Sequence, residues 1–172
     1  MKKKNVIKTR RYESPCGTLL LGSFGDKLCL CDWQIEKHRG HVDRRMKRIL
    51  NAEFEEGTSE VIKQAVRQLD EFFAGKRKVF DMPLLFVGTD FQKKVWRELL
   101  NIPFGETISY KEMARRIGLP TAVRAVANAN GANSVSIFAP CHRVIGSDNS
   151  LTGYGGGLAA KEKLLKLEGF LY

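Results

Sequence analysis

The sequence predicts an α+β protein in two parts, a small mixed unit over residues 1–84 and a mainly helical unit over residues 85–172. Two observations carry this prediction. Short apolar runs separated by turn residues lie near the N-terminus, whereas apolar residues at helical spacing dominate the second half. A chain of 172 residues, 43% of them apolar, is long enough to bury a substantial core.

A β-hairpin is the first element expected. Two short apolar runs at residues 18–24 and 27–33 flank Gly25 and Asp26, residue types that favour a tight turn. The stretch that follows, residues 34–56, is highly charged and cannot be assigned to a helix or a strand. The hairpin is therefore the one strand pair that the sequence predicts here.

A helix is expected next, over residues 59–73. Ser59 is a suitable N-cap, and Gly75 is a suitable stop signal. The apolar residues between them recur at helical spacing: Val61, Ile62, Ala65, Leu69, Phe72 and Phe73. Residues 79–84 then form a strand end or an extended crossing, which completes the first α+β unit.

The second half begins with a helix that Thr89 caps. Pro103 and Gly105 mark its end, because both residue types interrupt a helix. The apolar face expected for this helix consists of Phe91, Val95, Trp96, Leu99 and Leu100.

Two short helices joined by a tight turn follow, with the proportions of a helix-turn-helix. Ser109 and Glu112 are spaced as a capping box at the start of the first helix, which ends at residues 118–120. The second helix begins near Thr121 and runs towards Gly131. The pattern alone is weak evidence for DNA binding, because many helical proteins contain such a pair.

The first turns of this second helix carry small side chains around a single charge. The small residues are Ala122, Ala125 and Ala127, and the charge is Arg124. Small side chains allow a helix backbone to approach DNA closely. The alternative for Arg124 is an ordinary solvated charge on a helix.

The chain is strongly basic, with a formal net charge of +10 and a sequence pI near 9.6. This balance favours a polyanionic partner, with nucleic acid ahead of a membrane surface, although a solubilising surface is an alternative. Two basic clusters stand out, at residues 2–11 and 37–48. There is no apolar run near the ~18 residues of a membrane span and no secretory signal, so we expect no membrane partner. A cytoplasmic protein is expected, or a nuclear one in a eukaryotic source.

Four cysteines are present: Cys16, Cys29, Cys31 and Cys141. Without a secretion signal, a disulfide framework is not expected. Cys29 and Cys31 are two residues apart in an expected strand, which predicts that they lie on the same face as small buried side chains. A zinc site that adds His38 and His41 to this pair is the alternative, and Cys-x-Cys is not a usual zinc spacing.

Cys141 stands in a different setting, directly after a buried strand end expected at residues 137–139. Pro140 fixes its own φ and biases Ala139 towards extended geometry, so Cys141 is expected on a rigid turn. A thiol near its usual pKa of ~8.5 is mostly protonated at neutral pH, and a nucleophile therefore needs a base or a positive field. His142 and Arg143 supply both types of group. A structural cysteine beside a coincidental histidine is the alternative.

The segment Pro140-Cys141-His142-Arg143-Val144 resembles the active-site motif of the O6-alkylguanine-DNA alkyltransferases, also called methylated-DNA–protein-cysteine methyltransferases. Other segments resemble the same family at matching spacing: residues 102–110, residues 122–126, Asn133, residues 152–158 and residues 161–169. The resemblance covers residues 85–172 closely and residues 12–33 and 60–85 more loosely. It implies an N-terminal α+β domain with a ribonuclease-H-like sheet, packed on a helical C-terminal domain with a helix-turn-helix.

The resemblance implies a catalytic role for five side chains. Cys141 is implied as the alkyl acceptor, and His142 as the base that takes the thiol proton through a water. Glu168 fixes the imidazole tautomer as the third member of a triad, and Asn133 forms the hinge before the active-site turn. Tyr110 donates its hydroxyl towards guanine N3 as the base leaves. Arg143 is expected to be structural, tying the active-site strand to neighbouring backbone.

The partner implied is double-stranded DNA containing alkylated guanine, bound through the minor groove. Arg124 is implied to enter the base stack as the nucleotide is flipped out, and Ala122, Ala125 and Ala127 suit the narrow groove. Val144, Tyr154 and Gly155 are implied at the alkylguanine itself. O4-alkylthymine remains a second candidate substrate.

The reaction implied is a single irreversible transfer, because nothing in the sequence can cleave the stable thioether product. No cofactor and no metal are expected, and the protein is expected to be a monomer. Residues 154–157 carry three consecutive glycines, which predicts an open or mobile pocket that accepts bulkier alkyl groups. The basic N-terminal run matches nothing in the family and is interpreted as a solubilising tail.

A lesion-recognition protein and a cysteine hydrolase are the alternative functions. A lesion-recognition protein of the same fold binds alkylguanine without a cysteine acceptor, and Cys141 argues against it. A cysteine hydrolase with Cys141 and His142 turns over and gives no reason for a helix-turn-helix carrying Arg124.

Overall fold

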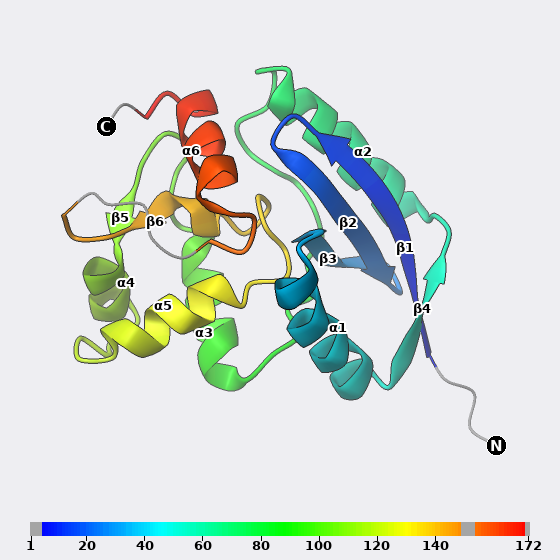
Figure 1. The fold of residues 1–172 in the computed structure, drawn as a ribbon, viewed down its shortest axis with the longest axis horizontal. Helices are drawn as coiled ribbons and strands as arrows, with labels where there is room; N and C mark the ends of the chain where they lie inside the picture. Colours follow the sequence, from blue (N-terminus) through cyan, green and yellow to red (C-terminus); the bar gives the residue numbers. More distant parts are fainter. Residues whose placement is uncertain (1–4, 149–153, 171–172) are drawn as a thin grey trace.

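A computed structural model describes residues 5–148 and 154–170, and a four-stranded sheet occupies its N-terminal part (Figure 1). The spatial order of the strands is β3-β2-β1-β4, in which β1 pairs antiparallel with β2 and parallel with β4. Their bounds are β1 Asn5–Ser14, β2 Gly17–Phe24, β3 Lys27–Trp33 and β4 Ala52–Glu56. The hairpin predicted from the sequence is confirmed as β2 and β3.

Strand β1 corrects the prediction that the basic N-terminal run is a solubilising tail. Residues 5–14 form an inner strand of the sheet, hydrogen-bonded on both sides. Ile7 and Thr9 are buried, Lys8 between them is half-buried, and Arg10 is exposed. Buried and more exposed positions therefore alternate along this part of β1, as in a half-buried strand. The alternation is not evident from the sequence because the more exposed positions carry long basic side chains.

Cys29 and Cys31 lie on different faces of β3, which corrects the prediction that they share one. The register with β2 shifts where Gly22 pairs with Leu30 and Ser23 pairs with Leu28, so Cys29 has no partner opposite it. Such a β-bulge reverses the side-chain alternation. Cys29 consequently joins the core beneath α1, and Cys31 joins the core beneath α2.

The unassigned stretch forms helix α1 (Glu36–Leu50) followed by β4. Val42 and Met46 lie one turn apart and are both buried against the sheet. Asn51 ends the helix in the left-handed conformation, with φ at 47°. The buried apolar stripe of α1 is narrow and most of the other positions are charged. The spacing of apolar residues in the sequence therefore did not indicate this helix.

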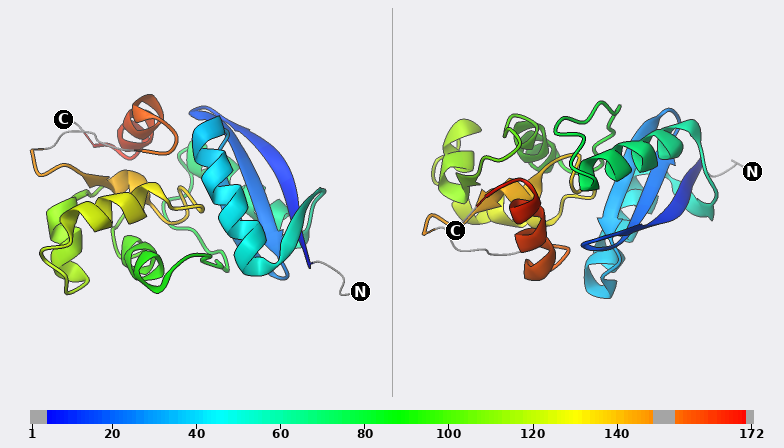
Figure 2. Two further views of the ribbon diagram at one scale, coloured as in Figure 1. Left: turned by 60° about the horizontal axis from the view of Figure 1, so that its bottom comes forward. Right: turned by 90° about the horizontal axis from the view of Figure 1, so that it is seen from above.

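Helix α2 (Glu60–Phe73) confirms the predicted helix, and Ser59 Oγ accepts the Ile62 N–H as its cap. Gly75 follows with φ at 75°, as expected of a stop signal. Figure 2 shows α1 and α2 on opposite faces of the sheet. Residues 79–84 are an extended crossing, joined to β3 by a single bridge between Leu84 and Leu28.

The C-terminal part consists mainly of helices packed on one another. Their bounds are α3 Asp90–Leu99, α4 Tyr110–Arg116, α5 Val123–Gly131 and α6 Leu158–Leu167. Thr89 caps α3 with a complete capping box, and Val95, Trp96 and Leu99 are buried as predicted. Leu100 is 49% exposed and does not belong to the apolar face.

Helices α4 and α5 form the predicted helix-turn-helix. Ser109 Oγ accepts the Glu112 N–H, while the Glu112 carboxylate is bound by Arg115 and Arg116 on the same helix. Gly118 adopts φ of 77° at the turn, where a residue with a Cβ would be strained. Short strands β5 (Ile108–Ser109) and β6 (Val144–Ile145) pair in parallel, which joins the start of this motif to the segment after Cys141.

The two parts of the chain are joined by backbone hydrogen bonds along the outer edge of β3, the edge that does not pair with β2. Cys31 N–H donates to the Ser134 carbonyl, and Ser136 N–H donates to the Cys31 carbonyl, both at 2.8 Å. The loop that leads to Cys141 is thereby attached to the N-terminal sheet. Within residues 5–148 and 154–170, the structure contains no helix long and apolar enough to cross a membrane.

Candidate active site

Cys141 follows a tight turn rather than the strand end predicted at residues 137–139. Ile137 adopts φ of 74°, rare for a β-branched residue, and residues 136 and 139 bridge each other across the turn. Asn133 braces the turn from inside: its Nδ2 donates to the Ala139 carbonyl at 2.9 Å and its Oδ1 accepts the Val135 N–H at 3.0 Å. Asn133, expected as a hinge, is thus hydrogen-bonded to backbone on both sides of the turn.

The Cys141 thiol is almost completely buried, with 3% of the residue exposed. Cys141 opens a short 3₁₀ turn, Cys141–Arg143, and Asn130 Nδ2 donates to its carbonyl at 3.2 Å. Burial raises the pKa of the thiol, and this outweighs the lowering effect of Asn133, Ser136 and the Lys161 charge. The resting group is therefore a neutral thiol, which needs a base to become a nucleophile.

His142 is fully buried and paired with Glu168, which ends helix α6. Its Nε2 lies 2.8 Å from Glu168 Oε2. An ionised carboxylate only accepts hydrogen bonds, so Nε2 carries the proton and Nδ1 keeps its lone pair. Nδ1 is buried and has no hydrogen-bond partner among the residues that the structure describes. Burial lowers the pKa of His142, which keeps the imidazole neutral and able to accept a proton.

Arg143 holds the other side of the same carboxylate. Its Nε and Nη2 donate to Glu168 Oε1 and Oε2, each at 2.8 Å, and its Nη1 donates to the Ile102 carbonyl at 2.6 Å. The contact with backbone agrees with the structural role expected for Arg143. The bidentate contact with Glu168 was not foreseen, and it fixes the carboxylate that orients His142.

The pKa of Glu168 reflects these contacts. Burial alone would raise it, but hydrogen bonds from His142 and Arg143 outweigh burial and hold the pKa at about 2. The carboxylate is therefore ionised at neutral pH, and His142 keeps one tautomer.

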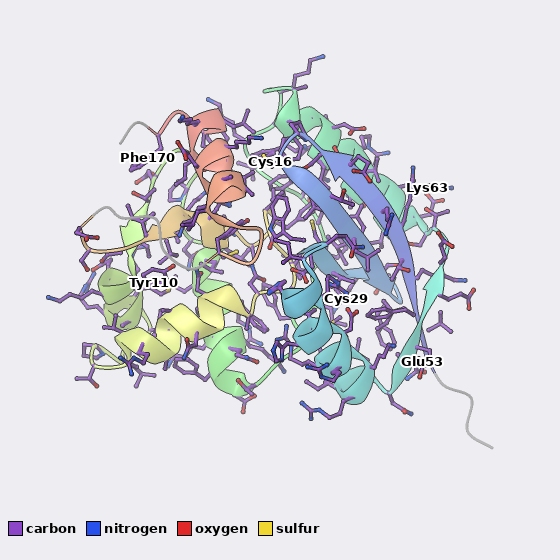
Figure 3. All side chains as sticks on the ribbon, in the orientation of Figure 1. Cys16, Cys29, Glu53, Lys63, Tyr110 and Phe170 are labelled. Atoms are coloured by element: carbon purple, nitrogen blue, oxygen red, sulfur yellow. The ribbon has the colours of Figure 1, made fainter. Side chains whose placement is uncertain are left out.

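Lys161 adds a buried positive charge beside the thiol. It is fully buried in α6, and its ammonium donates to the Val144 carbonyl at 2.7 Å and lies 5.8 Å from the centre of the Tyr110 ring. Burial lowers its pKa to about 8. Tyr110 is 7% exposed at the start of α4 (Figure 3), and Val144 is fully buried. Lys161 thus contacts both Tyr110 and Val144, which the sequence predicts to be site residues.

The glycine-rich segment packs closely on the N-terminal sheet, which corrects the prediction of an open or mobile pocket. A Cβ at Gly156 would lie 2.6 Å from the Trp33 ring, and one at Gly155 would lie 2.9 Å from the His38 ring. The Tyr154 hydroxyl accepts a hydrogen bond from Trp33 Nε1 at 3.2 Å. The glycines therefore permit close contact between the two parts of the chain. The related motif residues 152 and 153 lie outside the described residues.

We expect Gly156→Ala to destabilise the protein by about 1–3 kcal/mol, because the Trp33 ring is buried and cannot move away. This loss corresponds to a fall in melting temperature of several degrees. Gly131→Ala is the matched control, since a Cβ there meets nothing within 4 Å and alanine favours a helix. Equal melting temperatures for the two variants would contradict this account of the loop.

Helix α5 presents the residues predicted to face DNA. Arg124 and Ala125 are exposed, and Ala122 and Ala127 are partly exposed, whereas Val126 and Ala129 on the other side are buried. The exposed side combines small residues with one positive charge, as the sequence predicted.

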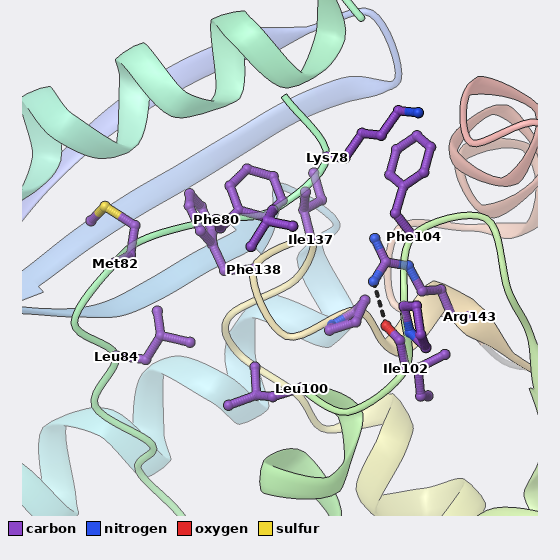
Figure 4. Close-up of a pocket in the computed structure, with 13 residues that line it drawn as sticks. Lys78, Phe80, Met82, Leu84, Leu100, Ile102, Phe104, Ile137, Phe138 and Arg143 are labelled. Atoms are coloured by element: carbon purple, nitrogen blue, oxygen red, sulfur yellow. Dashed lines mark hydrogen bonds between the residues drawn. The ribbon is translucent and has the colours of Figure 1, made fainter. Parts of the chain in front are cut away.

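A hollow of about 430 Å³ lies beside the turn that leads to Cys141 (Figure 4). Pro140 and Arg143 line it, with Phe104 near Arg143 and with Met82 and Leu84 at the far end, whereas Cys141 does not. The hollow is therefore bordered by residues that hold the site in place and not by the Cys141 thiol.

A zinc site is not assembled from the cysteine pair. Cys29 and Cys31 face different cores, and His38 Nε2 is engaged by the buried Asp32 at 2.7 Å. Among the described residues, no group of three or more histidine, cysteine, aspartate or glutamate side chains is placed to hold a metal ion.

Sequence reasoning missed four contributors to the site: Asn130, Ser136, Lys161 and the bidentate contact of Arg143. Lys161 left a detectable signal, because it shares a helix face with the apolar residues Leu164 and Leu165. A lysine at a buried position of a helix predicts a partner inside the protein. The other three depend on contacts between distant segments and leave no local pattern.

Comparison with known proteins resolves the family. The chain matches the family models for the 6-O-methylguanine DNA methyltransferase ribonuclease-like domain over residues 7–86 and DNA-binding domain over residues 90–170. The chain belongs to the 6-O-methylguanine DNA methyltransferase family. The resemblance found in the sequence is thereby confirmed. The mixed sheet followed by helices also confirms the predicted fold class.

The chain is similar to named relatives over 60% or more of its length. The methylated-DNA–protein-cysteine methyltransferase of Methanosarcina barkeri is 48% identical over 91% of this chain and 93% of its own. The Mycobacterium tuberculosis protein is 57% identical over 60% of this chain. A crystal structure of the M. tuberculosis protein in complex with DNA superposes with a TM-score of 0.78, at 43% identity, over 95% of this chain and 92% of that one.

Proposed function

We propose that this protein repairs DNA by moving the alkyl group of O6-alkylguanine onto the sulfur of its own Cys141, once per chain. The observation that carries the proposal is the buried Cys141 thiol beside a neutral His142, whose tautomer is fixed by Glu168 and Arg143. The family of the chain supports the same reaction.

The thiol proton goes to His142 Nδ1, either directly or through a water, since Nε2 is committed to Glu168. The thiolate attacks the alkyl carbon, a C–S bond forms, and the C–O6 bond breaks with its electron pair leaving on guanine. The charge of Lys161 lowers the thiolate's energy. Imidazolium formation is stabilised by the Glu168 carboxylate.

The departing guanine takes up one proton, which balances the one lost from the thiol. Tyr110 donates its hydroxyl towards guanine N3 in this proposal and recovers a proton from the imidazolium or from solvent. Val144, Tyr154 and Gly155 border the alkylguanine. The products are guanine and a stable thioether, so the reaction needs no cofactor and ends after one event. O4-alkylthymine remains a candidate second substrate.

The lesion lies inside a duplex, so the nucleotide has to be flipped out before it reaches Cys141. Helix α5 enters the minor groove with Ala122, Ala125 and Ala127, and Arg124 fills the space in the base stack. A monomer suffices for this interaction. We assign residues 1–84 to support of the site and residues 85–172 to DNA binding and alkyl acceptance.

Arg124→Ala is expected to slow repair of duplex DNA by roughly 10–100-fold, because unstacking costs a few kcal/mol that the side chain no longer offsets. The deficit should shrink when the lesion is unpaired and flips more easily. Arg67→Ala, which removes an exposed charge from α2, should repair at the wild-type rate. An Arg124 variant as fast as wild type on paired DNA would contradict this role.

The proposal is tested by mixing the protein with a tenfold excess of duplex carrying O6-methylguanine and counting restored guanines over time. One restored guanine per chain, followed by a plateau, is the expected result. Continued release of product would instead support the cysteine hydrolase alternative. Tight lesion binding without restoration would support a lesion-recognition protein.

A further inference from the structure

Helix α1 carries a basic surface that the proposed reaction does not use. The helix contains six lysine and arginine residues but two acidic residues. Arg39 is buried and paired with Asp32 and Asp43, and Arg45 turns inward. Among the side chains of α1 that the structure describes, the exposed positive groups are therefore Arg44, Lys47 and Arg48, all in the second half of the helix.

Arg44 and Arg48 point away from the sheet. They lie four residues apart, one turn of helix, while Val42 and Met46 occupy the opposite, buried side. Lys47 pairs with Glu53 at 3.8 Å. Within the described part of the chain, no acidic side chain forms a salt bridge with Arg44 or Arg48, and His41 is the one side chain hydrogen-bonded to Arg44.

Arg45 fixes this basic surface relative to the helix-turn-helix. Its Nε donates to the Val87 carbonyl at 3.0 Å, just before α3, and its Nη2 donates to the Ala132 carbonyl at 2.8 Å, at the end of α5. Its guanidinium also lies 5.3 Å from the centre of the Trp96 ring. Figures 1 and 2 both show α1 beside α3 and the C-terminal end of α5.

Helix α3, which lies between α1 and α5, also carries exposed positive side chains. Lys94 and Arg97 are exposed on it, and no described acidic side chain forms a salt bridge with either. Positive side chains thus lie on three adjacent helices, two of them outside the helix-turn-helix. A polyanion that contacts the exposed side of α5 passes close to this charge.

We propose that Arg44 and Arg48 bind backbone phosphates of the same duplex, on the flank nearest the C-terminal end of α5. This inference rests on the proposed function, which places DNA on α5. Four residues of helix separate the two arginines by ~6 Å along the axis, within reach of neighbouring phosphates on one strand for such long side chains. The N-terminal domain then extends the DNA contact as well as supporting Cys141.

The test compares Arg44→Ala/Arg48→Ala with Lys63→Ala/Arg67→Ala. The second pair removes the same charge from α2, on the opposite face of the sheet, and Figure 3 shows Lys63 far from α5. The Kd for an unmodified duplex of roughly two helical turns is measured against salt concentration, because each phosphate contact contributes about 0.9 to the slope of log K against log salt. Circular dichroism melting verifies that both variants fold.

We expect the slope of the α1 variant to fall by about 1–2 relative to wild type, with the α2 variant unchanged. Equal slopes for the two folded variants would overturn the inference. Alkyl transfer is followed separately by mass, so a wild-type protein that binds DNA without gaining mass overturns the proposed function while the slopes still decide the role of α1.

Discussion

Replacing Glu168 with glutamine is expected to slow alkyl transfer by about 10²–10⁴-fold, since a neutral amide no longer fixes the His142 tautomer or stabilises the imidazolium. The same change leaves the Arg143 guanidinium buried without its carboxylate. Breaking a buried ion pair in this way destabilises a protein by about 3–5 kcal/mol. Single-turnover kinetics and chemical denaturation measure the two effects on the same sample.

The pH dependence of stability distinguishes the effect of the Glu168 charge from the effect of its side-chain shape. The pKa of Glu168 is about 2 in the folded chain against a usual value of 4.5. Its contribution, about 3 kcal/mol, is therefore complete above pH 4.5 and is lost as the pH falls from 4.5 towards 2. The free-energy difference between wild type and Glu168→Gln should shrink across this window. Glu162→Gln, which breaks an exposed pair with Lys166 on the same helix, should alter stability by less than about 1 kcal/mol.

Cys141→Ala is expected to abolish alkyl transfer while leaving lesion binding intact. The thiol is the sole group proposed to accept the alkyl carbon, whereas Arg124, Tyr110 and the rest of the DNA surface remain. The variant should hold a flipped alkylguanine without converting it, and a mobility-shift titration against a lesion duplex measures this directly.

Cys16→Ala is the matched control for the thiol, because Cys16 is half-buried in the N-terminal part and no step is assigned to it. It should transfer one alkyl group per chain at the wild-type rate. Residual transfer by Cys141→Ala would show that another thiol accepts the group and would remove the basis of the mechanism.

Local signals predicted the elements that local chemistry determines. Ser59, Thr89 and Ser109 each cap the helix they were expected to cap, and the α4–α5 pair follows from its turn residues. Cys141 and His142 could be predicted as the candidate nucleophile and base because they are neighbours after Pro140. Glu168 was placed through the family resemblance, since 26 residues separate it from His142.

The errors arose where distant contacts override local patterns. The sequence predicts a tail where β1 lies because many of its side chains are basic, although Ile7 is buried against residues of the sheet and of α1. The bulge at Cys29 depends on pairing with β2, which the sequence of β3 does not encode. The glycines at 155 and 156 suggested an open pocket, whereas Trp33 and His38, more than a hundred residues earlier, occupy the space.

The central claim is that Cys141 itself receives the alkyl group. Intact mass spectrometry after incubation with a duplex carrying one O6-methylguanine, followed by peptide mapping, tests it most directly. The account predicts one added methyl group per chain, saturating at that value and located on the peptide that contains Cys141. A methyl group mapped to another residue, or no mass change despite lesion binding, would contradict it.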